Sequence, residues 1–145
     1  MNKKNLSKKN YIDLLDPYST ECFWHIVSKI KDHDKKIEFS ELKLSALHIL
    51  EYMLENKIVF IIEKITQDKR IIRDKRTTNE VLKYIDKSWN EETEFIDLYN
   101  LAWLGFENWY KNDLIKIGLK ETINWKHFVK NNIGDLMNWI NENKP

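Results

Sequence analysis

The sequence predicts a mainly helical α+β domain, with about five helices and a small β-hairpin near residues 57–74. Three observations support this prediction. Apolar residues recur every three or four positions over most of the chain, which is the period of an amphipathic helix. The stretch from Ile58 to Ile62 is instead continuously apolar, rich in β-branched residues and aromatic at its centre. Only three glycines and two prolines occur in 145 residues, which favours helices joined by short connections.

The length of 145 residues fits a single domain, because two cores would each have too few residues. The chain is 42% hydrophobic and contains six Trp, six Tyr and six Phe, so it can build a real core. We expect residues 1–10 to form a flexible basic tail and residues 11–145 to form the globular domain.

The first helix is predicted to begin near Pro17, with Asp16 as its N-cap. Its apolar face would consist of Phe23, Ile26, Val27 and Ile30. Ser40 is the predicted N-cap of the second helix, with Phe39 packed on Leu44 as a hydrophobic staple. Its apolar face would consist of Leu44, Leu47, Leu50 or Glu51, and Leu54, and Asn56 would end it in a left-handed conformation.

Residues 57–66 are predicted to form a strand, 67–69 a turn and 70–73 the returning strand of a hairpin. Thr77 and Glu80 match a capping box, which opens the next helix. The inward residues of that helix would be Val81, Leu82, Ile85 and Trp89.

A further helix is predicted over 95–110, although Gly105 weakens it by roughly 1 kcal/mol relative to alanine. Its apolar positions are Phe95, Leu98, Ala102 or Trp103, Phe106 and Trp109. Residues 113–119, which end near Gly118, fit either a helix or a short strand. The last helix, predicted over 125–140, would be capped by Thr122 or Asn124.

Composition excludes several classes of protein. Cys22 is the only cysteine, so the chain is not a disulfide-stapled scaffold. The basic start of the chain is not followed by an apolar run, so we expect no signal peptide. The longest apolar run is too short to cross a bilayer, and we expect a soluble, cytoplasmic protein that does not bind membranes. The net charge of +1 argues against a strong, uniform field for nucleic acid.

The sequence contains no catalytic or metal-binding signature. His25 and His48 could each share a helical face with a glutamate, but no further ligands converge on either pair. Cys22 and His25 are three residues apart, yet no orienting group or oxyanion hole can be identified. We therefore expect no metal, no cofactor and no enzymatic activity.

The most unusual segment lies between Lys87 and Lys111, where no basic residue occurs. Its acids are Glu91, Glu92, Glu94, Asp97 and Glu107. Its aromatic residues are Trp89, Phe95, Tyr99, Trp103, Phe106, Trp109 and Tyr110. Acids beside aromatic anchors suit a surface that binds a basic protein partner. We expect Trp103 in the core, and the five acids with Trp109 and Tyr110 as the partner-binding residues.

All three arginines lie within the hairpin region, which predicts an alternative site. The residues for nucleic-acid binding would be Lys69, Arg70, Arg73, Lys75 and Arg76. Two helices and a basic hairpin resemble a winged helix in outline, but helix 41–55 carries mainly acids where a recognition helix needs cations. A third possibility is that the hairpin cations pair with the acidic segment inside the fold.

The order of elements carries a family resemblance over about residues 44–110. A leucine-rich helix, 46–57, runs into a hydrophobic strand, then a polar hairpin, the helix 82–89, an acidic turn and the segment 101–106 (Leu-Ala-Trp-Leu-Gly-Phe). This order resembles the immunity proteins of bacterial contact-dependent growth inhibition and other polymorphic toxin systems. The resemblance implies a cytoplasmic, non-enzymatic, single-domain protein that binds and neutralises one cognate toxin domain. Many such toxins are basic nucleases, whose phosphate-binding cleft an acidic patch can occupy.

Overall fold

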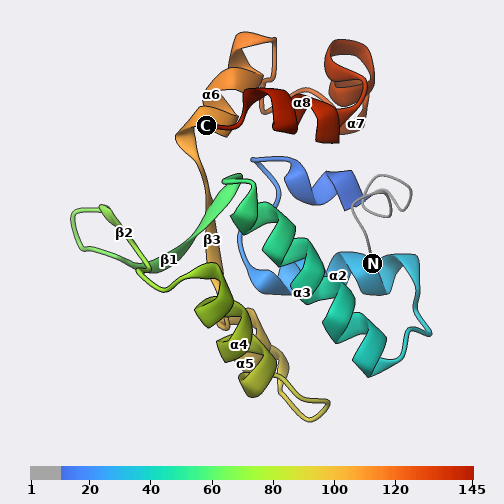
Figure 1. The fold of residues 1–145 in the computed structure, drawn as a ribbon, viewed down its shortest axis with the longest axis vertical. Helices are drawn as coiled ribbons and strands as arrows, with labels where there is room; N and C mark the ends of the chain where they lie inside the picture. The colour runs from blue at the N-terminus through green and yellow to red at the C-terminus, as the bar shows by residue number, and fades with distance from the viewer. Residues whose placement is uncertain (1–10) are drawn as a thin grey trace.

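The computed structural model describes residues 11–145 and has the predicted mainly helical α+β fold (Figure 1). The predicted tail, 1–10, lies outside the described residues. The first half contains the 3-10 helix η1 (Tyr11–Leu15), α2 (Phe23–His33), α3 (Phe39–Glu55), β1 (Val59–Ile65), β2 (Ile71–Arg73) and α4 (Thr78–Ser88). The second half contains α5 (Phe95–Tyr99), β3 (Trp103–Phe106), α6 (Asn108–Lys116), α7 (Trp125–Phe128), the π-helical turn η2 (Val129–Ile133) and α8 (Leu136–Asn143).

The three strands form one antiparallel sheet in the order β2-β1-β3. Residues 21–23 cover the outer edge of β3 through two backbone hydrogen bonds. Phe23 N donates to Ala102 O at 2.9 Å, and Leu104 N donates to Glu21 O at 2.8 Å. The hairpin of β1 and β2 projects from the body of the molecule (Figure 1).

One core joins the N-terminal helices to the sheet and to the C-terminal helices. Helix α3 packs against both α2 and α4, and α6 to α8 form a separate layer at one end (Figure 1). The side chains that are completely enclosed include Phe23, Ile26, Ile30, Leu50, Met53, Ile58, Ile85 and Leu114. These residues come from both halves of the chain, as a single hydrophobic core requires.

The first helix begins six residues later than Pro17, so the predicted start is wrong. Asp16 instead closes a turn, in which its side chain accepts hydrogen bonds from Tyr18 N at 3.0 Å and Ser19 Oγ at 2.7 Å. The later start follows from the sheet, because residues 21–23 are held extended against β3. The predicted apolar face is confirmed: Phe23, Ile26, Val27 and Ile30 are all buried.

The second helix ends at Glu55, as predicted, but it begins earlier than predicted and buries a different face. It begins at Phe39, so Ser40 is not its N-cap, and Leu44 is 52% exposed. Phe39 packs edge-on against the ring of Trp89, with the ring centroids 5.3 Å apart, rather than on Leu44. Since α3 contacts two helices, its buried residues form a broader stripe: Leu42, Ser45, Ala46, Ile49, Leu50, Tyr52 and Met53. Lys57, with φ 55°, is the left-handed residue in place of Asn56.

The hairpin and the capping box are confirmed. β1 and β2 pair antiparallel, and Lys69 in the connecting turn has φ 63°. Glu80 N donates to Thr77 Oγ1 at 3.2 Å, and Thr77 N donates to Glu80 Oε1 at 3.3 Å, so the start of α4 satisfies two otherwise unpaired amides.

The predicted helix over 95–110 is wrong. The segment divides into α5, β3 and the start of α6. Its middle pairs with β1, and Phe60 lies opposite Gly105. The ring of Phe60 covers Gly105 so closely that a Cβ atom at this position would collide with it. Glycine is therefore required by the strand packing, and does not weaken a helix.

The predicted helix over 125–140 is interrupted. Gly134, with φ 86°, ends the π-helical turn, and Asp135 then caps α8 by accepting from Asn138 N at 3.1 Å. Asn124 caps α7 as predicted, accepting from His127 N at 3.0 Å. The segment near 113–119 is the end of α6, followed by Gly118 at φ 112°.

Candidate functional site

The loop after α4 and the short helix α5 carry four exposed acids: Glu91, Glu92, Glu94 and Asp97. No ion pair within residues 11–145 includes any of these four carboxylates. A groove of about 600 Å³ lies between α4 and α5. Its lining includes Glu92, Glu94, Asp97, Tyr84, Asn90 and Asn100. We call these four acids, together with the groove that Glu92, Glu94 and Asp97 line, the acidic groove.

The acidic loop is held in place by hydrogen bonds and by Lys43, whose Nζ also lies 3.0 Å from Asp86 Oδ1. Asn90 Oδ1 accepts from Glu92 N at 2.9 Å, and Thr93 Oγ1 accepts from Asn90 N at 2.9 Å. Lys43 Nζ donates to Trp89 O at 2.7 Å and to Asp86 O at 2.6 Å, which fixes the point where α4 ends. The carboxylates are thus displayed on a loop whose backbone is already ordered.

Exposed apolar side chains lie beside the acidic groove. Phe95 is 57% exposed and Ile96 is 64% exposed, whereas Leu98 on the same helix is buried. The ring of Phe95 contacts the rings of Trp24 and Tyr99, with centroid distances of 4.9 and 5.7 Å. The sequence pattern placed Phe95 in the core, because a long helix would have turned it inward. In the structure Phe95 is instead the first residue of the five-residue helix α5 and remains exposed.

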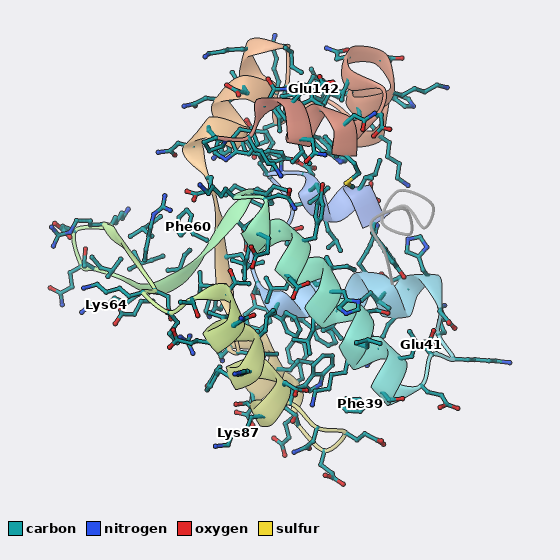
Figure 2. The ribbon with its side chains drawn as sticks, viewed as in Figure 1. Phe39, Glu41, Phe60, Lys64, Lys87 and Glu142 are labelled. Atoms are coloured by element: carbon teal, nitrogen blue, oxygen red, sulfur yellow. The ribbon has the colours of Figure 1, made fainter. Side chains whose placement is uncertain are left out.

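Glu107 is separate from the other four acids. Its Oε1 lies 2.6 Å from Arg73 Nη2, and the Arg73 guanidinium lies 3.7 Å above the ring of Phe60. The pairing between the acidic segment and the arginine hairpin therefore occurs for this one acid. Figure 2 shows Phe60 on the sheet and Lys64 farther out along the projecting hairpin.

Tyr110 is completely buried, so its predicted role as an exposed anchor is wrong. Its hydroxyl donates to Leu15 O at 2.6 Å, and burial raises its pKa well above the ordinary value. Trp109 is half-buried. Its Nε1 donates a hydrogen bond to Lys57 O, and its ring stacks on that of Trp139 with the ring centroids 6.3 Å apart. Trp103, expected in the core, is also half-buried and contacts Tyr99 at 4.9 Å.

The hairpin cations fall into two groups. Arg73 is paired with Glu107, and Arg76 forms a two-pronged ion pair with Asp74, in which Nη2 lies 2.7 Å from Oδ2. The Arg76 hydrogen bonds hold the pKa of Asp74 below its usual value. Lys69, Arg70 and Lys75 are exposed and form no ion pair within the described chain. Only part of the predicted basic surface is thus available to phosphate groups.

A second hollow, of about 570 Å³, lies beside η1 and α2. Its lysines are already paired, because Asp13 Oδ2 lies 2.7 Å from Lys29 Nζ and 3.5 Å from Lys126 Nζ. His25 also lines it, and its Nδ1 accepts a hydrogen bond from Glu21 N at 2.9 Å. This internal pairing makes the second hollow a weaker candidate than the acidic groove.

Within residues 11–145, no three His, Cys, Asp or Glu side chains are grouped so that they could hold a metal ion. Cys22 is buried, and burial raises its pKa, which disfavours the reactive thiolate. None of the helices in this part of the chain is long and apolar enough to cross a membrane.

Comparison with protein-family models, curated proteins and solved structures gives no significant match. Function must therefore be inferred from the surface itself.

Proposed function

We propose that this chain is a non-enzymatic immunity protein that binds and neutralises a cognate bacterial toxin domain through the acidic groove and α5. One observation carries the proposal. Four exposed carboxylates, which form no ion pair within residues 11–145, adjoin two exposed apolar side chains, Phe95 and Ile96. Charges of one sign accelerate encounter with an oppositely charged partner, and apolar side chains supply the area that is buried on binding.

The chemistry of this surface agrees with the family resemblance. An immunity protein needs a prepared binding surface but no catalytic group. The ordered acidic loop lowers the entropy lost on binding, because its backbone is already fixed by Lys43 and Asn90. If the toxin is a basic nuclease, the carboxylates occupy the place of substrate phosphates, and binding takes place in the cytoplasm.

A nucleic-acid-binding regulator is the competing function. It would use Lys69, Arg70, Arg73, Lys75 and Arg76 on the hairpin. Two of these, Arg73 and Arg76, already pair with carboxylates, so phosphate contacts would have to compete with internal ion pairs. In the part of the chain that the structure describes, no cation pairs with the four acids of the acidic groove, which is why we propose a protein partner.

The test is capture of the tagged chain from the lysate of its native cells, with one half treated with nuclease, followed by mass spectrometry. We expect one stoichiometric protein in both halves. Expression of that protein in a heterologous bacterium should stop growth, and co-expression of this chain should restore it. A chain with Glu92→Lys and Asp97→Lys should fail to protect. Recovery of nucleic acid alone, with nothing left after nuclease treatment, would contradict the proposal.

A further inference from the structure

We infer that the outward face of α5 is the apolar centre of a docking surface for a basic amphipathic segment, in which apolar side chains are flanked by lysines or arginines. The inference rests on the proposed function, because it states the chemistry of the toxin segment that meets this surface. It also replaces Trp109 and Tyr110 with Phe95 and Ile96 as the residues expected to anchor the partner.

Two apolar side chains of α5, Phe95 and Ile96, are exposed. Leu98 is the residue of α5 that is buried in the core. Ile96, two residues earlier, lies on nearly the opposite side of the helix. Ile96 and Phe95 are, respectively, the first and third most exposed of the large hydrophobic side chains described. Phe95 is also braced edge-on by Trp24, at an interplanar angle of 87°. A braced aromatic ring loses little side-chain entropy when a partner covers it.

Carboxylates flank these two apolar side chains in the sequence. Glu94 directly precedes Phe95, and Asp97 directly follows Ile96. Any partner segment that covers the two apolar residues therefore brings its flanking residues close to carboxylates. Acidic flanks would be repelled, whereas lysine or arginine flanks would form the ion pairs that these carboxylates lack among the described residues 11–145.

Two arginines of the chain itself lie over aromatic rings beside carboxylates. Arg73 lies 3.7 Å above the Phe60 ring while pairing with Glu107. Arg76 lies 4.9 Å over the Tyr84 ring while pairing with Asp74. The fold thus twice combines an aromatic ring with a carboxylate to hold a guanidinium. The surface around α5 offers the same two kinds of group to a cation from outside.

The test uses two synthetic peptides of identical leucine and lysine composition. One places its leucines on a single helical face, and the other has the same residues in a scrambled order. We expect the purified full chain to bind the amphipathic peptide at least about tenfold more tightly than the scrambled one, as measured by calorimetry. Phe95→Ser with Ile96→Ser should remove this difference. Glu94→Gln with Asp97→Asn should weaken binding and flatten its dependence on salt.

The matched control is Ile65→Ser with Ile71→Ser, because these residues are exposed isoleucines on the hairpin. It should bind the amphipathic peptide as the wild type does, and all variants should be folded at the temperature of the binding measurement. An equal loss of affinity for the amphipathic peptide in the control, or no loss of affinity in the α5 variant, would overturn the inference. Self-association of the wild type that disappears in the α5 variant would also overturn it, since a second copy would then be the occupant. The peptide result does not depend on toxin protection, so failure of the proposed function would be seen separately.

Discussion

Arg73 and Glu107 form an ion pair that spans the central strand of the sheet, with Nη2 2.6 Å from Oε1. Arg73 ends β2, Glu107 follows β3, and Phe60 of β1 lies between them under the guanidinium. The pair therefore helps to hold three strands together, and it already occupies the charges of one acid and one arginine, although the Arg73 side chain stays half-exposed.

Neutralising the arginine hairpin separates the two candidate functions. Arg70→Gln, Arg73→Gln and Arg76→Gln together should leave toxin binding nearly intact. They should lower the free energy of unfolding by about 1–2 kcal/mol, because two exposed ion pairs are lost. Denaturant unfolding and binding calorimetry measure the two effects. Loss of toxin binding at unchanged fold would show that the hairpin, not the acidic groove, is the interface.

Charge reversal in the acidic groove should weaken partner binding. Glu92→Lys with Asp97→Lys should raise the dissociation constant at least about tenfold and reduce its dependence on ionic strength. The control is Glu51→Lys with Glu55→Lys, which makes the same change in net charge at exposed positions of α3. An unchanged affinity in the groove variant, or an equal loss in the control, would show that the surface assignment is wrong.

Tyr110 should matter for stability and not for binding. Tyr110→Phe removes the hydroxyl that donates to Leu15 O, and it leaves a carbonyl inside the core without this partner. We expect a loss of about 1–3 kcal/mol in the free energy of unfolding. Affinity for the toxin, measured well below the melting temperature, should not change. A large loss of affinity in a fully folded variant would restore Tyr110 as part of the interface.

Gly105 should be intolerant of even a methyl group. Gly105→Ala places a Cβ atom against the Phe60 ring and should cost about 1–3 kcal/mol of stability. Phe60→Leu should relieve most of this cost, because the far edge of the ring is removed. A double-mutant cycle in denaturant measures the coupling between the two positions. Additive effects would show that the contact between ring and glycine is not what limits this position.

Asp74 should make stability depend on pH in the acidic range. Its pKa in the folded chain lies below the ordinary value of 3.8, chiefly because Arg76 donates hydrogen bonds to the carboxylate. The ionised form therefore stabilises the folded state above the unfolded pKa, and this contribution disappears as the pH falls through the folded pKa. Asp74→Asn should be less stable by about 1 kcal/mol near neutral pH. The difference from wild type should vanish in strong acid, and a constant difference would contradict the assignment.

The sequence by itself determined the features that depend on near neighbours. The hairpin follows from a β-branched run and a turn, and the capping box follows from the spacing of Thr77 and Glu80. The buried face of α2 follows from its period. The absence of cations from 88–110 is also a property of sequence alone, and it pointed to the segment that contains the acidic groove.

Only the tertiary structure decided which of these residues reach the surface. Residues 103–106 have the apolar spacing of a helix, but pairing with β1, more than 40 residues earlier, makes them a strand. In the same fold α5 is only five residues long, Phe95 and Ile96 are exposed, Tyr110 is buried, and Glu107 pairs with Arg73. Local propensity acts over a few residues, whereas burial depends on which distant segments pack together. The pattern of one short segment therefore could not distinguish a core aromatic residue from an exposed one.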